Sequence, residues 1–468
     1  MKRLTSLPVL FLLGAVISGC TVGPHYKRPD VPVAPDFRGP DNTPVADASS
    51  VANQKWFDVF HDPDLQRLIR EALQSNFDLR IAAQHVLEQQ AQVGITRSQQ
   101  FPTVTVGGTA VGARLGSSFA SALKSPETTA GGGFDLSATW NPDFWGLYRR
   151  QTEAARAQLL AQQWAQKAVL STLVANVATA YIQLRTLDRE LAITRDTLRV
   201  RQESLQLTEK LESGGSATLS DVREAQALVY TASSNIPSLE QQIQQQENEI
   251  NLLLGRKPGP VVRSQSYTPA QNVGSVPAGI PSQLLERRPD IQRAEADLIA
   301  ANANIGVARA QFFPSLPISA TGGVGSDAFS SLFNASGGLV YGMGSVTQPL
   351  FEGGRLKNNL RLAKATDQEM VISYQKAINT AFHDVSNALI AYRKTRDYRE
   401  QQQDLVGAEE DATRLAELRY KAGATAYLEV LTNEANRYAA QLSLASAQQN
   451  EALSLVELYN ALGGGWQQ

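Results

Sequence analysis

The pattern of apolar residues shows two long stretches in which apolar positions recur alternately three and four residues apart. In the first stretch these positions are Leu170, Leu173, Val177, Ala180, Leu184, Leu187 and Leu191. In the second they are Tyr374, Ile378, Ala381, Val385, Ala388 and Tyr392. This heptad spacing favours long helices that pack against other helices. It predicts long helices over 145–211 and 352–421, each followed by a Gly-bearing turn and a second helix, over 218–254 and 425–462.

Between the helical stretches the pattern changes to one that is typical of strands. Four segments are low in charge and rich in Thr, Val, Gly and Ser, and the first two contain alternating apolar and polar residues. They predict two hairpins, with strands over 101–115 and 131–142 and over 313–325 and 337–350. The Gly/Ser/Ala-rich stretch inside the first hairpin is expected to be an exposed loop.

The same elements occur twice, which indicates an internal repeat. Phe101-Pro102 matches Phe313-Pro314 at an offset of 212 residues, and Gly215 matches Gly423 at an offset of 208. The predicted first repeat covers 61–254, the Pro-rich linker 255–285, the second repeat 286–462 and the C-terminal tail 463–468. A period of this kind has to be identified before the fold is assigned, because each copy is one structural unit.

The N-terminus has the pattern of a secretory signal peptide over 1–19. Two basic residues precede an apolar run that is too short to span a bilayer. Cys20 follows a small residue and resembles the lipobox cysteine of bacterial lipoproteins, so we expect it to carry the covalent lipid, palmitate included. By resemblance to sorting rules, Thr21 after it favours the outer membrane. Residues 20–60 are rich in Pro, Asp, Ala and Ser, and predict an extended N-terminal strap.

Composition removes several classes of function. The 468 residues carry a formal charge of -2, which offers no basic field for nucleic acid. The single Cys excludes an internal disulfide, and the four His residues are scattered, so no metal site or catalytic constellation is expected. The sequence predicts neither an enzyme nor a cofactor other than the lipid. An incidental cysteine in a secreted protein is the alternative interpretation of Cys20.

The hairpins then constrain the oligomeric state. Each predicted strand has about the length of a tilted membrane-crossing strand. Four strands cannot close a barrel, and open sheet edges cannot lie in lipid. Two chains would give eight strands and a barrel filled by side chains, whereas three chains give twelve and leave a lumen. We therefore expect a trimer with a 12-stranded transmembrane β-barrel, continued by a ring of the long helices.

Aromatic residues gather at the predicted strand–helix borders, and two interpretations stay open for them. They are Phe101, Trp140, Phe144, Trp145, Phe312, Phe313 and Phe351. A belt at the membrane interface would use such residues. Packing at a strand–helix joint would use them equally well.

Several motifs resemble one known family, the TolC-like outer-membrane efflux lipoproteins (NodT type, of resistance-nodulation-division systems). The matching segments are Cys20–Pro29, Trp56-Phe57 with Asp62-Pro63 and Leu65, Glu286–Ile291 and Gly423–Val430. The resemblance covers essentially the whole chain. It implies a mainly α fold with a transmembrane β part: a trimeric 12-stranded β-barrel, a 12-helix periplasmic α-barrel and an equatorial band. It also implies a periplasmic adaptor protein and an inner-membrane pump as partners.

In that arrangement the two Gly-bearing turns lie at the far periplasmic end. The turn glycines Gly214, Gly215 and Gly423 are expected to supply the positive φ that a sharp reversal needs. Some relatives carry charged residues at the positions of Thr425 and Thr432, so a charged latch of that type is not expected here.

Three residues beside these turns are candidates for a periplasmic gate: Asp221, Tyr420 and Glu429. Rings of three like charges near a narrow mouth would favour cations and could couple opening to partner contacts. The alternative is local: acids at helix N-termini complement the helix dipole, and the tyrosine packs the last helical turn.

The sequence thus predicts an outer-membrane exit duct of a tripartite efflux system, which exports small toxic compounds passively from a Gram-negative periplasm. Two alternatives remain. One is a type I-like duct for polypeptide secretion that uses the same barrel. The other is a structural coiled-coil lipoprotein between the envelope layers, which the low charge of the hairpins disfavours.

Overall fold

The computed structural model describes residues 21–32, 37, 55–123, 128–264, 281–326 and 337–466 of the chain. The chain divides into two compact units, each assembled from three separate stretches of sequence. Unit 1 consists of Met1–Asp30, Val86–Gln162 and Ala294–Tyr374. Unit 2 consists of Val31–His85, Gln163–Arg293 and Gln375–Gln468. The predicted signal peptide and Cys20 lie outside the described residues.

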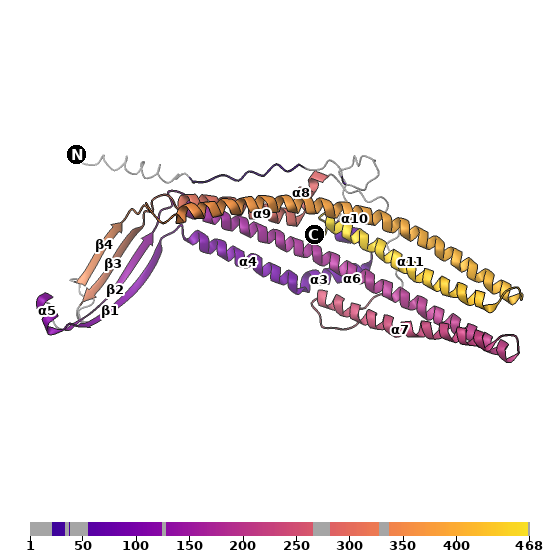
Figure 1. The fold of residues 1–468 in the computed structure, drawn as a ribbon. Coiled ribbons are helices and arrows are strands. Elements are labelled where there is room, and N and C mark those ends of the chain that lie inside the picture. Colours follow the sequence, from indigo (N-terminus) through magenta and orange to yellow (C-terminus); the bar gives the residue numbers. More distant parts are fainter. Residues whose placement is uncertain are drawn as a thin grey trace. The chain divides into compact units, whose positions relative to one another are not determined.

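The order of elements repeats once along the chain (Figure 1). The first copy contains α4 (Phe77–Ser98), β1 (Thr103–Arg114), β2 (Thr128–Trp140), α6 (Leu147–Ser213) and α7 (Leu219–Leu253). The second contains α9 (Pro289–Ala310), β3 (Ile318–Ser326), β4 (Gly338–Gly344), α10 (Arg355–Lys421) and α11 (Tyr427–Ala461). Both long helices have 67 residues and both return helices have 35. The compact units cut across the two copies, because each unit takes the corresponding parts of both.

The remaining elements are short and lie outside this repeat pattern. They are α2 (Trp56–Val59), α3 (Pro63–Ser75), α5 (Ser117–Leu123), a 3₁₀ turn η2 (Pro281–Gln283) and α8 (Leu284–Arg287). The start of α3 follows from its sequence: the Asp62 side chain accepts hydrogen bonds from the first free amides, and Pro63 occupies the position where its missing N–H costs nothing. None of the described helices combines the length and the apolar content that crossing a bilayer requires.

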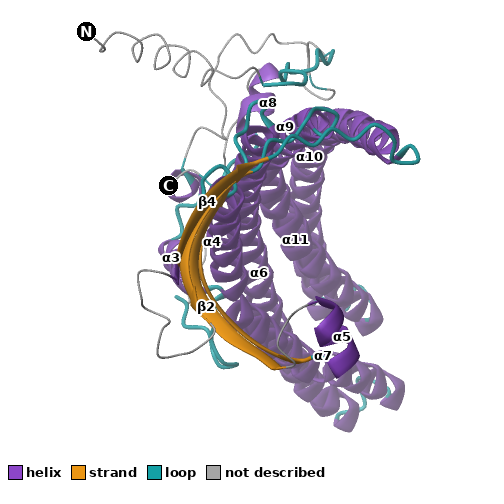
Figure 2. Cartoon of the chain, turned by 90° about the vertical axis from the view of Figure 1, so that its left-hand side faces the viewer, coloured by secondary structure: helices purple, strands orange, loops and turns teal. Residues whose placement is uncertain are grey.

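The four strands form one antiparallel sheet in the order β1-β2-β3-β4, which Figure 2 shows as a curved ribbon. The register is continuous from Thr103↔Thr139 to Arg114↔Thr128 in the first hairpin. The inside of this hairpin differs from the expected plain loop, because Ser117–Leu123 forms a helical turn, α5. Its apolar residues and its lack of Pro allow that turn to close.

The second hairpin is shorter than its sequence predicted. Strands were expected over 313–325 and 337–350, but the ladder runs only over Ile318–Ser326 and Gly338–Gly344. The reason is proline, since Pro314 and Pro317 carry no N–H for a ladder. Beyond the ladder the Ser345 N–H donates to the Pro317 carbonyl at 3.1 Å, and Ser315 and Thr347 form an isolated bridge with reciprocal N–H···O bonds of 3.0 Å.

The heptad positions predicted from the sequence form the interior of the helical packing. In the second copy all six, from Tyr374 to Tyr392, are at most 8% exposed. In the first copy Leu173, Val177, Ala180 and Leu184 are buried, and the other three pack against them. The prediction that these positions form the packed face of the long helices is confirmed.

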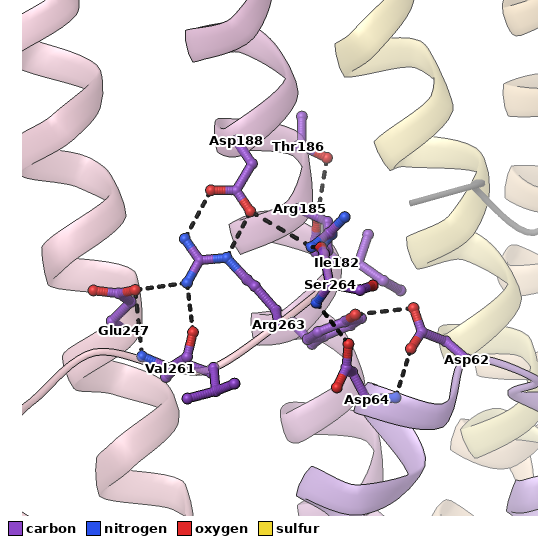
Figure 3. A network of polar contacts seen from close by, with 12 residues as sticks. Asp62, Asp64, Ile182, Arg185, Thr186, Asp188, Glu247, Val261, Arg263 and Ser264 are labelled. Carbon is purple, nitrogen blue, oxygen red and sulfur yellow. Dashed lines mark hydrogen bonds and ion pairs between the residues drawn. The ribbon is translucent and has the colours of Figure 1, made fainter. Parts of the chain in front are cut away.

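In unit 2, ion pairs and hydrogen bonds hold the first part of the linker against the helices (Figure 3). The Arg263 guanidinium makes two bonds to the Asp188 carboxylate on α6, of 2.6 and 2.7 Å, and one of 2.6 Å to Glu247 on α7. The neighbouring Ser264 donates its N–H to Asp64 on α3, and its carbonyl accepts from Arg185 on α6. Residues 261–264 therefore tie three helices together.

Candidate functional site

The sheet of unit 1 has two faces of different chemistry, and the register assigns each side chain to one of them. Residues opposite each other on neighbouring strands share a face, and the faces alternate along each strand. One face carries Val104, Val106, Ala110, Phe134, Leu136, Ala138, Trp140, Ile318, Ala320, Val324 and Val340, with Arg114, Thr128 and Ser326 at its far end from the strand–helix border. The other carries Thr103, Thr105, Thr109, Asp135, Ser137, Thr139, Ser319 and Thr321, together with the apolar residues Val111, Ala113, Leu339, Tyr341 and Met343.

The apolar face of the sheet is largely exposed in the part of the chain that the structure describes. Val106 is 78% exposed, Leu136 57% and Val340 87%. A contiguous exposed surface of this kind marks contact with a membrane or with another protein. Alternation of apolar and hydroxyl-bearing residues is the pattern of strands that face lipid on one side and water on the other. The sheet thus has the chemistry of part of a transmembrane wall.

Both edges of the sheet are unpaired among the described residues, since β1 and β4 each pair with a single neighbour. Open edges present free N–H and C=O groups, which lipid cannot satisfy. With four antiparallel strands, β1 and β4 run in opposite directions. The β4 edge of one copy can therefore pair antiparallel with the β1 edge of another copy.

Both interpretations of the aromatic residues at the strand–helix border find support. Trp145 stacks on Phe313 with ring centroids 4.8 Å apart, and its indole N–H donates to the carbonyl of Pro314 at 2.8 Å. Phe101 and Trp140 are instead 55% and 41% exposed. Trp145 is therefore a packing residue, while exposed rings such as Phe101 and Trp140 have the placement of an interfacial belt.

The N-terminal strap enters unit 1 at this border. The Val22 N–H donates to the carbonyl of Trp145 at 3.1 Å. Gly23 has φ +116°, and a Cβ there would lie 2.5 Å from the Gly306 Cα on α9. The buried Arg150 side chain donates to the carbonyls of both Val22 and Gly23. In the sequence, the predicted lipid attachment residue Cys20 stands two positions before Val22, the first residue of this packed crossing.

Farther along the strap, a charged pair holds it to α9. Glu295 is 8% exposed and accepts two bonds from the Arg28 guanidinium, of 2.7 and 2.5 Å, and one from the Tyr26 hydroxyl at 3.0 Å. Hydrogen bonding to Glu295 raises the pKa of Arg28, and burial followed by the charge of Glu295 raises the pKa of Tyr26. The strap is thus a docked part of the fold over these residues.

Replacing Glu295 by Ala is expected to release the strap. The three bonds above are lost, and Arg28 is partly exposed, so we expect a local cost of about 1–2 kcal/mol. Hydrogen exchange of the amides of residues 22–28 should then be about tenfold faster than in the parent protein. His25→Ala, at an exposed strap position, is the control and should leave exchange unchanged; equal protection in Glu295→Ala and the parent would contradict the docking role.

The two helix-connecting turns in unit 2 have the same geometry. Gly215 and Gly423 have φ values of 77° and 71°, as the sequence predicted. In the first turn the Ser216 N–H donates back to Leu211 at 2.7 Å, and Ala424 donates to Arg419 at 2.9 Å in the second. These bonds close the helix ends in the Schellman pattern.

The prediction for Gly214 was wrong, because this residue is not among the positive-φ glycines. Its N–H donates to the carbonyl of Lys210 at 3.2 Å, so it completes the last turn of α6. One left-handed residue is sufficient to reverse the chain, and Gly215 provides it.

Asp221 lies in a capping box at the start of α7. Its carboxylate accepts from the Thr218 N–H at 2.7 Å and the Thr218 hydroxyl at 2.8 Å, and the hydroxyl caps the Asp221 N–H in return. Asp221 therefore stabilises the N-terminus of α7, as the local interpretation of this acid predicted. Its charge also acts on Tyr420, whose pKa is raised by burial and, secondarily, by Asp221.

Glu429 and Tyr420 connect α10 to α11. The Glu429 carboxylate accepts from Arg419 at 2.7 Å and from the Thr425 hydroxyl, so it joins the last turn of α10 to the first turn of α11. Tyr420 packs against Tyr427 with centroids 5.0 Å apart. Both tyrosines belong to a small core to which α6, α7, α10 and α11 all contribute. The three gate candidates thus lie around one packed end of unit 2.

Sequence reasoning missed a buried polar cluster near this end. Arg201 on α6 is 3% exposed, donates to the carbonyl of Leu228 at 2.9 Å and lies 5.1 Å from the Tyr438 ring centroid. Glu434 on α11 is 5% exposed, and burial raises its pKa. Charged residues on a heptad helix are normally solvated, so no pattern in the chain distinguished these two. In the described part of the chain, no group of three His, Cys, Asp or Glu residues could hold a metal ion.

Comparison with known proteins identifies the family. The outer membrane efflux protein family profile matches residues 68–256 and 280–464. The cation efflux system protein CusC of Escherichia coli is 35% identical over 460 residues, covering 98% of each chain. The toluene efflux pump outer membrane protein TtgC of Pseudomonas putida is 36% identical over 468 residues, covering 99% of this chain and 96% of that protein. The open-state crystal structure of the MtrE outer membrane channel of Neisseria gonorrhoeae superposes with a TM-score of 0.85 at 32% identity, covering 96% of this chain and 99% of that one.

Proposed function

Since the chain belongs to the outer membrane efflux protein family, we propose that three copies close one barrel and form the exit duct of a tripartite efflux system. The family is one of transport channels rather than enzymes, and the chain is an outer-membrane efflux protein. The observation that carries the proposal is the four-stranded sheet with an uncovered apolar face and two open edges.

A barrel closed by three copies fits an exit duct better than a barrel closed by two. Each copy has two open edges, four in a pair of copies and six in three, and none of them can be left in lipid, so closure must use every β1 and β4 edge. An eight-stranded barrel is filled by its own side chains, whereas twelve strands enclose water. The face rich in Thr and Ser would line that water, and the apolar face would contact lipid.

The lipid on Cys20 is part of the same proposal. The strap that follows it is bound to the backbone of Trp145, at the strand–helix border, through the Val22 N–H. Lipid chains on Cys20 would therefore enter the membrane near the border at which the strands end. Each buried methylene adds about 0.8 kcal/mol of anchoring, so several acyl chains hold the protein firmly.

The helical part would extend into the periplasm and meet an adaptor protein and an inner-membrane pump. The turns around Gly215 and Gly423 are the proposed contact and gating region, because their acids and tyrosines lie around one small core. Relatives are named for the efflux of cations and of toluene. Such different cargoes among relatives support a duct that conducts the compounds a pump delivers to it.

Removing the side chains of Tyr420 and Glu429 together is expected to raise the conductance of the resting channel in planar bilayers. The double substitution to Ala deletes the Arg419–Glu429 pair and the Tyr420–Tyr427 contact, which join α10 to α11. Asp221→Ala tests the third gate candidate separately, since it removes the acid of the capping box of α7 and leaves the contacts between α10 and α11 in place. Unchanged single-channel conductance in the double variant would reject a role of these residues in closure.

Deletion of the gene tests the function itself. The deletion strain should lose tolerance to at least one class of toxic small molecule, and the parent gene should restore it. The purified protein should conduct ions in planar bilayers. A coiled-coil spacer predicts no conductance, and a duct for polypeptides predicts lost secretion with unchanged tolerance, so the two measurements separate all three functions.

A further inference from the structure

The polar face of the sheet carries one acid whose surroundings distinguish it. Asp135 lies in β2, five residues before Trp140, which places it roughly 17 Å along the strand from the strand–helix border. It is the only Asp or Glu in the described strands, and no described residue makes a hydrogen bond or ion pair with its carboxylate. Its neighbours on the same face, Ser137 and Thr139, are uncharged.

The register places a glycine on each side of this acid. Asp135 pairs with Gly107 on β1 and with Gly323 on β3. A Cβ at Gly107 would lie 2.7 Å from the Asp135 Oδ1, and a Cβ at Gly323 would lie 3.1 Å from the Asp135 Cβ and 2.6 Å from the Phe134 carbonyl oxygen. At Gly323 the clash would be with backbone, so glycine is required there, whereas a side chain at Gly107 would displace the carboxylate from its present position. The acid therefore stands on the polar face with no side chain beside it on either neighbouring strand.

We propose that Asp135 is a selectivity residue of the duct: three copies form a ring of carboxylates in the wall of the lumen that favours the passage of cations over anions. The proposal rests on the trimeric barrel proposed above. Rings of carboxylates are a known device for cation preference in pores. The ring lies within the membrane-spanning wall, separate from the acids at the helical turns, so it acts on every solute that leaves the duct.

The effect should be modest and should depend on salt, because the lumen contains water. At 0.1 M salt the screening length is about 10 Å, and three charges at such distances change the ratio of cation to anion permeability by about two- to threefold. At 1 M salt the screening length is about 3 Å, and the preference should nearly vanish.

Reversal potentials of the purified trimer in planar bilayers, under a KCl gradient, test this proposal. Asp135→Asn should lower the ratio of potassium to chloride permeability by about two- to threefold at low salt. Asp135→Lys should lower it further, and Asp135→Glu, which keeps the charge, should retain the parent value.

The outcomes separate the two proposals. Conducting Asp135→Asn channels with the parent reversal potential would overturn the selectivity ring and leave the duct intact. Absence of conductance in the parent protein and all variants would overturn the duct, and the ring with it. A shift in Asp135→Asn that Asp135→Glu does not show supports the ring.

Discussion

Replacing Leu136 by Arg is expected to abolish assembly of the barrel in the outer membrane. Leu136 is on the apolar face of β2, and its side chain is 57% exposed in the single chain. An arginine in the lipid-facing middle of a barrel costs about 2–4 kcal/mol per chain, hence roughly 6–12 kcal/mol for three copies. That sum is comparable to the whole free energy of unfolding of an ordinary folded protein, about 5–15 kcal/mol. The measurement is the amount of trimer in isolated outer membranes, detected as a band whose migration in gel electrophoresis changes on heating.

The adjacent residue provides a matched control. Ser137 follows Leu136 on β2, but its side chain is on the opposite face, where its hydroxyl hydrogen-bonds that of Thr105 at 2.9 Å. Ser137→Arg adds the same side chain to the water-filled side and should leave the trimer present. Equal loss in both variants, or in neither, would contradict the assignment of the faces.

The second large effect is expected in unit 2, from replacing Arg263 by Met. Arg263 is 15% exposed in its side chain and pairs with Asp188 and Glu247. Its hydrogen bonds to Asp188 raise its pKa despite burial, so it is charged at any physiological pH. Methionine keeps the volume but removes the cation that Glu247 and Asp188, 13% and 29% exposed, share, and leaves Asp188 only its 3.9 Å contact with Arg185. Because the site is not fully dry, we expect a loss of about 2–4 kcal/mol.

Thermal and urea unfolding of the purified protein, followed by helical circular dichroism, should show this loss as a lower midpoint. Arg199→Met is the control, since Arg199 also bridges two acids, Asp196 and Glu203, but is exposed with them. Solvent screens such pairs, so this variant should unfold like the parent protein. A midpoint for Arg263→Met equal to that of Arg199→Met would show that the linker is not held by these ions.

Periodicity explains why much of the fold could be predicted from the sequence. A seam such as Ile378, Ala381 and Val385 is encoded by spacing alone, and all three residues are fully buried. Gly215 and Gly423 could be assigned because their turns require a positive φ that few other residues adopt. The shortened second hairpin was readable in principle, since Pro317 marks the point at which a ladder has to stop.

The rest depended on contacts between residues far apart in the chain. Arg28 and Glu295 are separated by 267 positions, and no pattern near either residue indicates the pairing. The glycines beside Asp135 become meaningful only once the register brings three strands together. For Asp221 the local signal was present, since Thr218 stands three residues before it and completes a capping box.

The account depends on closure of open sheet edges by other copies of the chain. Its most direct test is the number of chains in the purified, detergent-solubilised complex, measured by light scattering with the detergent mass subtracted. We predict three chains, in a particle whose migration changes on heating. A particle with one chain would contradict the account. So would a particle with any number of chains other than three whose strands are cleaved by protease in membranes.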